Sequence, residues 1–96
     1  MGKTKKSVMT EDMEHCFVCG SPYIQTHHVL YGAGNRIIAD RYGYIIPLCL
    51  EHHTGNGGVH FNEEMDLHFK QMAQEHFEKH HGTREDFIKV FGKSYL

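Results

Sequence analysis

The sequence predicts a small α+β domain, and three observations lead to this fold class. The middle of the chain holds two short strand-like runs, one of them β-branched. Apolar residues in the last third recur at the spacing of one helix face. Cysteines and histidines occur in closely spaced pairs around the strand-like runs. With 96 residues the chain has room for one domain, and a bound metal often stabilises so thin a core.

The composition excludes several classes of protein. With 40% hydrophobic and 23% charged residues, the chain is not expected to be disordered throughout. Ten Lys and Arg against twelve Asp and Glu give a net charge of −2, which does not favour DNA binding by charge alone. No apolar run approaches the ~18 residues of a membrane span, and the N-terminus lacks the apolar segment of a secretory signal. We expect a soluble, cytoplasmic protein.

The chain is expected to form a flexible N-terminal segment, residues 1–13, and one domain, residues 14–96. The first segment is polar, carries several lysines and shows no periodicity. The domain begins with Cys-x-x-Cys followed by Gly, Ser and Pro, which is typical of a metal-binding knuckle turn.

A β-hairpin with a long connection is expected in the middle of the domain. Its strands would be residues 25–30 and residues 42–50. Pro47 would confine the second strand to an edge or place it at a strand end. Residues 31–35 are expected to be a loop, because their glycines and asparagine tolerate positive φ.

A long helix should follow, beginning after Asn62 and ending near Gly82. Asparagine is a favoured N-cap, and the two glutamates after it suit the positive end of the helix dipole. The apolar face of this helix would carry Met65, Phe69, Met72, Ala73 and His76.

Two shorter elements complete the prediction. Residues 52–58 are expected to be a helical turn or loop, since their glycines would not sustain a long helix. Thr83 and Asp86 have the spacing of a capping box before a short final helix. Its apolar face would carry Phe87, Val90 and Phe91.

Two ligand pairs about 30 residues apart predict a structural zinc site. Cys16 and Cys19 form one pair, and Cys49 and His52 form the other. Thiolates and imidazole are the ligands that Zn²⁺ takes in tetrahedral sets of four. His53 could replace His52 as the fourth ligand. The alternative is that the cysteines are buried as small apolar residues.

Four further histidines remain in the same region once zinc has its ligands: His27, His28, His53 and His60. Three imidazoles can hold a divalent transition metal, and a fourth beside it could act as a general base. Adjacent strand residues point to opposite faces, so His27 and His28 would meet at one site only at a kink or strand end.

The order of these motifs resembles the HNH, or ββα-metal, endonuclease superfamily, in its zinc-bearing branch. The matching pieces are CFVC, then HHV, then LCLEHH. The segments GYIIPLCLEHHTGNGGVH and FGKSYL further resemble the small bacteriophage-type RecA-dependent nucleases. The resemblance implies a ββα-metal (His-Me finger) core held by zinc, followed by the long and the short helix.

The resemblance also implies roles for the remaining histidines. His28 would be the general base, and His27 would be a catalytic-metal ligand where the family usually has Asp or Glu. His53 would be the second ligand and His60 the third, with Asn56 as the alternative. The sequence departs from the family pattern in having Tyr44 at the middle Asn position, and His52 where the second zinc pair usually has Cys.

The function implied is a DNA endonuclease that hydrolyses phosphodiester bonds with Mg²⁺, Mn²⁺ or another divalent transition metal. It would nick or cut with weak specificity in phage recombination, inside a bacterial or phage-infected cell, with a recombinase filament as a partner. Arg36 and Arg41 could contact DNA phosphates, although Arg41 with Asp40 could equally form a surface cluster. The alternatives are a zinc-bearing module that binds DNA or protein without cutting, and a metal buffer or sensor.

Overall fold

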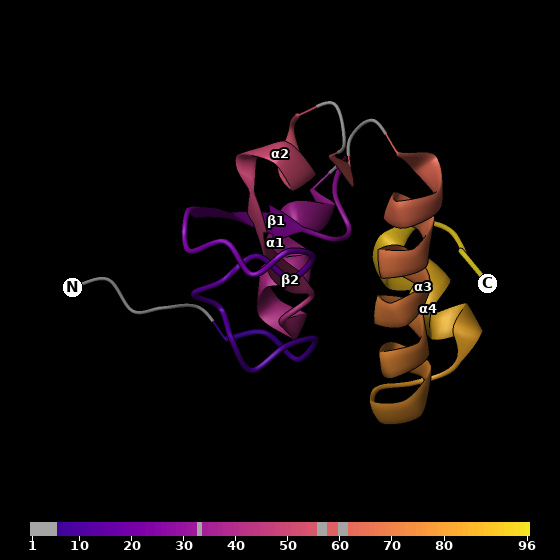
Figure 1. Cartoon of the computed structure of the whole chain (residues 1–96). Coiled ribbons are helices and arrows are strands. Elements are labelled where there is room, and N and C mark those ends of the chain that lie inside the picture. The colour runs from indigo at the N-terminus through magenta and orange to yellow at the C-terminus, as the bar shows by residue number, and fades with distance from the viewer. Residues whose placement is uncertain (1–5, 33, 56–57, 60–61) are drawn as a thin grey trace.

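In the part of the chain that the structure describes, two strands and two helices lie on one side and two helices on the other (Figure 1). This arrangement is a compact α+β domain, as the sequence predicts. The structure is a computed structural model that describes residues 6–32, 34–55, 58–59 and 62–96. Its elements are β1 (Ile24–His28), α1 (Asn35–Tyr42), β2 (Ile45–Cys49), α2 (Leu50–His53), α3 (Glu63–His80) and α4 (Arg84–Phe91).

The two strands pair antiparallel, and a helix lies in the connection between them. Thr26 of β1 stands opposite Pro47 of β2, and His28 at the end of β1 stands opposite Ile45. α2 begins directly after β2, so that strand, strand and short helix follow one another in space.

Helix α1 is the main feature that the sequence analysis missed. The sequence analysis placed no helix in the long connection between the strands, and Tyr42 ends α1 instead of starting a strand. The helix has eight residues and no side-chain N-cap, so the usual start signal is missing. Gly34 and Gly43 flank it with φ of 87° and 82°, and Gly34 is one of the glycines from which a loop was expected over residues 31–35.

Strand β2 is buried along its whole length. One edge pairs with β1, and residues that precede β1 in the chain contact the other edge. The Ser7 hydroxyl donates to the Ile45 carbonyl at 2.6 Å, and the Phe17 amide donates to the Pro47 carbonyl at 2.7 Å. Pro47 has no N–H to leave unsatisfied, which makes it compatible with a central position in this buried strand.

The two C-terminal helices begin as predicted. Asn62 caps α3 by accepting a hydrogen bond from the Met65 amide at 3.0 Å. Thr83 and Asp86 form the predicted capping box at the start of α4. Among the helices described, none has both the length and the apolar character needed to cross a membrane.

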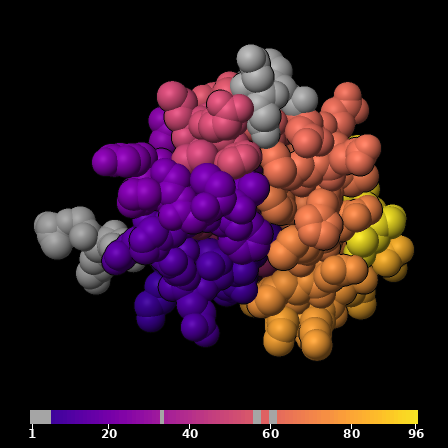
Figure 2. Space-filling view, viewed as in Figure 1, coloured from indigo at the N-terminus to yellow at the C-terminus, as the bar shows by residue number. Residues whose placement is uncertain are grey.

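The core lies between the strands and the two C-terminal helices, which form one continuous surface in Figure 2. Phe17 of the knuckle packs edge-on against Phe69 of α3, with ring centroids 5.7 Å apart. Phe77 of α3 packs similarly on Phe87 of α4 at 5.4 Å. Buried residues from every layer join this core, among them Val29, Leu30, Tyr44, Ile46, Leu48, Ala73 and Phe91.

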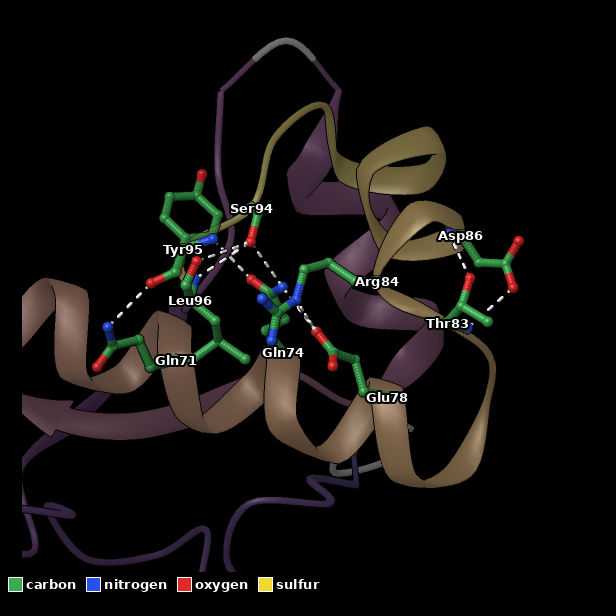
Figure 3. A network of polar contacts seen from close by, with 9 residues as sticks. All are labelled: Gln71, Gln74, Glu78, Thr83, Arg84, Asp86, Ser94, Tyr95 and Leu96. Atoms are coloured by element: carbon green, nitrogen blue, oxygen red, sulfur yellow. Dashed lines mark hydrogen bonds and ion pairs between the residues drawn. The ribbon is translucent and has the colours of Figure 1, made fainter.

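A polar network fastens the C-terminal tail to α3 (Figure 3). Gln74 is fully buried, and its side-chain amide both donates a hydrogen bond to the tail and accepts one from it. Its Nε2 donates to the Ser94 hydroxyl at 3.0 Å, and its Oε1 accepts from the Tyr95 amide at 2.7 Å. Gln71 donates to the Tyr95 carbonyl at 2.9 Å. The buried amide is therefore paired at both ends, which offsets the cost of removing it from water.

Candidate functional site

A tight knuckle turn positions the first two cysteines. The Gly20 amide donates to the Cys16 carbonyl at 2.9 Å, and the Cys16 amide donates to the Ser21 carbonyl at 2.8 Å. Gly20 has φ of 82°, a conformation that glycine adopts without the steric cost of a side chain. The turn brings the Cys19 sulfur close to Cys49, at the end of β2.

Three cysteines and one histidine form a cluster with the dimensions of a tetrahedral metal site. We call it the Cys3His cluster: Cys16, Cys19, Cys49 and His52. Their ligand atoms all lie within 4.8 Å of one another. The Cys19 and Cys49 sulfurs are 3.7 Å apart, and the Cys49 sulfur is 3.3 Å from His52 Nδ1. Sulfurs about 2.3 Å from a tetrahedral Zn²⁺ lie about 3.8 Å apart, so the cluster can hold a structural metal such as zinc.

The surroundings of Cys16 favour its thiolate, the form that binds a metal. Burial opposes ionisation of this thiol, but backbone amides of Cys49, Cys19 and Val18 donate hydrogen bonds to the sulfur. Together these groups lower the pKa of Cys16 from 9.0 to about 6. A ligand that is already ionised near neutral pH binds a metal without a large proton cost.

The adjacent histidines of α2 belong to different surroundings. His52 completes the Cys3His cluster, so it, and not His53, is the histidine beside the cysteines. His53 instead lies against His27, with ring centroids 5.2 Å apart. The four-residue helix α2 therefore connects the metal cluster to the second group of histidines.

Those histidines line one pocket of about 390 Å³. His27 and His28 both reach it because His28 is the last residue of β1, the strand end at which such a meeting was expected. His27 is buried, and its Nε2 atom is shielded from solvent. We call this the histidine pocket; its lining residues are Thr26, His27, His28, Tyr31, Gly32, Arg36 and His53.

The third predicted ligand of the catalytic metal cannot be placed. His60 and its alternative Asn56 lie outside the described residues. Among the residues that are described, the Cys3His cluster is the only group of three or more Cys, His, Asp or Glu side chains close enough to hold an ion. The pocket itself brings together two of the predicted ligands, His27 and His53, together with the predicted base His28.

Two side chains that the sequence analysis did not assign to the site contact the pocket histidines. Asp40 of α1 accepts a hydrogen bond from His28 Nε2 at 2.8 Å. The Gln25 side-chain oxygen accepts one from His53 Nδ1 at 2.7 Å. The His28 side chain is 15% exposed and the Asp40 side chain 29%, so water does not fully screen their contact. No sequence motif marks either partner.

The two arginines that were predicted to contact DNA phosphates lie at different parts of the surface. Arg36 lines the histidine pocket from the first turn of α1. Arg41 lines different hollows of the surface, one of them with Lys89 and Val90 of α4. Tyr44, at the position of the family's asparagine, is buried and bonds His76 at 3.0 Å.

Comparison of the chain with protein-family models, with curated proteins and with solved structures gave no match.

Proposed function

We propose that this protein is a divalent-metal-dependent DNA endonuclease of the HNH type. One observation carries the proposal: His27, His28 and His53, given catalytic roles by the resemblance, line a single pocket with Arg36. These residues come from β1, α1 and α2, so their meeting is a property of the fold. The presence of three histidines and an arginine in one pocket favours a common functional role over chance placement.

The order of the elements supports the same proposal. His27 and His28 end the first strand of the pair, and His53 lies on the short helix that follows the second strand. The Cys3His cluster lies at the start of that helix and would fix its position. In this proposal zinc is structural, and it holds α2 so that His53 faces His27.

The donor atoms of the pocket fit a transition metal better than Mg²⁺. Imidazole nitrogen suits ions such as Zn²⁺, Fe²⁺ or Ni²⁺, whereas Mg²⁺ prefers oxygen. His27 and His53 would hold the ion together with a third ligand. When bound, the ion would supply charge stabilisation at the scissile phosphate and the leaving oxygen.

His28 would act as the general base of the hydrolysis. A histidine suits proton abstraction from water because its usual pKa of about 6.5 lies near neutral pH. The proton of the attacking water would pass to the imidazole while the water oxygen bonds to phosphorus and the P–O bond to the leaving oxygen breaks. Arg36 is exposed at the same pocket and would pair with a neighbouring phosphate.

Plasmid nicking tests the proposal. Supercoiled plasmid is incubated with the zinc-loaded protein and Mg²⁺, Mn²⁺, Co²⁺ or Ni²⁺. We expect the wild type to convert it to open circles, fastest with a transition metal. His28→Ala should fold and keep zinc but lose at least a hundredfold in rate, in line with the usual contribution of a general base. His68→Ala replaces an exposed histidine of α3 and should cut at the wild-type rate.

Two outcomes would contradict the proposal. Equal cleavage by the wild type and His28→Ala would remove His28 from the reaction. Absence of cleavage by the wild type, with every ion and with a recombinase filament added, would favour a zinc-bearing module that binds DNA or protein without cutting. The filament arm also tests the partner that the resemblance implies.

A further inference from the structure

The histidine pocket contains two histidines whose ring nitrogens are used in opposite ways. His28 uses Nε2 to contact Asp40, and His53 uses Nδ1 to contact Gln25. A carboxylate and an amide oxygen can only accept hydrogen bonds, so the contacting ring nitrogen must carry the proton in each case. In the neutral rings, the lone pair is then left on Nδ1 of His28 and on Nε2 of His53.

We propose that Asp40 and Gln25 hold His28 and His53 in opposite tautomers, which makes one ring a base and the other a metal ligand. This inference deepens the proposed function and rests on it for the two roles. Asp40 and Gln25 are positioning residues, because each would act through a histidine and not on the substrate.

The contact of Asp40 is suited to a base. A carboxylate that accepts a hydrogen bond from one ring nitrogen fixes the orientation of the imidazole and stabilises the imidazolium formed when the other nitrogen takes a proton. Asp40 lies on α1 four residues after Arg36, so both project from the same side of this helix. Helix α1 thus brings a phosphate contact and the partner of the base to one pocket.

The contact of Gln25 is suited to a ligand. A metal-binding histidine usually donates its second ring N–H to an oxygen, which fixes the tautomer and orients the ring. Gln25 is neutral, so it orients His53 without adding charge beside the ion. The Nδ1–H form is the less common tautomer of histidine in water, so its presence at His53 would depend on Gln25.

Nuclear magnetic resonance tests the tautomers without DNA or a catalytic ion. Long-range ¹H–¹⁵N correlations are recorded on the zinc-loaded protein at a pH of about 8, where free imidazoles are neutral. We expect the proton on Nε2 at His28 and on Nδ1 at His53. Gln25→Leu should shift His53 towards the Nε2–H form, and Asp40→Ala should abolish the slowly exchanging Nε2 proton of His28.

The Gln25→Leu and Asp40→Ala variants should lose different functional properties. Gln25→Leu should weaken Mn²⁺ binding, measured directly by electron paramagnetic resonance, by about 10–100-fold, and saturating Mn²⁺ should restore its cleavage rate. Asp40→Ala should bind Mn²⁺ as the wild type does and cut about 10–100-fold more slowly even at saturation. Asp12→Asn is the matched control, since it changes an exposed Asp–His pair of similar length, 2.9 Å from His15, and should change nothing.

The two proposals fail in different ways. A wild type that never cleaves DNA but shows the expected tautomers would contradict the nuclease and leave the positioning contacts standing. A wild type that cleaves DNA with either ring in the other tautomer would overturn this inference. So would variants in which both Mn²⁺ affinity and saturated rate fall together, because that is the result of general structural damage.

Discussion

Single residues give this chain a pH response that does not depend on a bound metal. Burial, followed by the nearby His80 and His81, lowers the pKa of His76 below its usual 6.5. His76 also pairs with the buried hydroxyl of Tyr44, and burial raises the pKa of that phenol well above 10.0. In this environment the folded protein keeps His76 neutral where an unfolded chain would protonate it.

The expected result is loss of stability in acid. Below a pH of about 6.5 the unfolded chain gains a proton at His76 that the folded chain does not, so the free energy of unfolding falls as the pH decreases towards the lowered pKa. His76→Gln should lose less stability than the wild type between a pH of about 7 and about 5.5. Urea unfolding of both zinc-loaded proteins measures this, and equal losses would show that His76 does not contribute.

The histidines of the pocket could be chosen from the sequence, but the two residues that hold them by hydrogen bonds could not. His27, His28 and His53 stand in a recognisable order of motifs, so they could be chosen beforehand. Asp40 and Gln25 lie 12 and 28 residues from their partners, and only the fold brings each pair together. A hydrogen bond between residues so distant in sequence leaves no local pattern.

At the scale of elements, the polar network of α3 determines how the C-terminal tail is held. Gln74→Leu keeps a similar volume but leaves the Tyr95 amide and the Ser94 hydroxyl without their buried partner. We expect a loss of about 1–3 kcal/mol in the free energy of unfolding. Gln71→Leu removes one hydrogen bond from a half-buried side chain and should cost less. Denaturant midpoints rank the two, and the reverse order would contradict the role given to Gln74.

Helices with local signals were predictable, and the helix without them was not. Asn62 and the Thr83–Asp86 capping box are start signals that predict α3 and α4. α1 is as short as α4 but has no side-chain cap, and it is held by its contacts with β1 and α4. The stability of α1 comes from tertiary packing, and the residue pattern of the sequence does not show which segments pack together.

At the scale of the whole molecule, the Cys3His cluster joins the knuckle, β2 and α2 at one point. Structural zinc contributes roughly 10–16 kcal/mol of apparent binding free energy in small domains, which exceeds the whole stability of most chains of this size. Removal of the ion should therefore unfold the protein. Chelation should abolish the near-ultraviolet circular dichroism, and added Zn²⁺ should restore it.

Substitution of one cluster cysteine tests the role of the ion in stability without a chelator. Cys16→Ser removes a buried ligand, and we expect neither zinc nor fixed tertiary structure in the purified protein. A folded Cys16→Ser protein that still carries one zinc per chain would show that the cluster is not what holds the domain together.

Helix α2 has a consequence for the thermodynamics of metal uptake. Its four residues are too few to be stable alone, and neighbouring residues of this one turn face two different sites. An ion among the cysteines would order the turn before a second ion arrives, so the second would bind a ring that is already in position. Such coupling is reciprocal: an ion in the histidine pocket should tighten zinc binding by the same factor. The affinity measured at either site would then depend on whether the other site is filled.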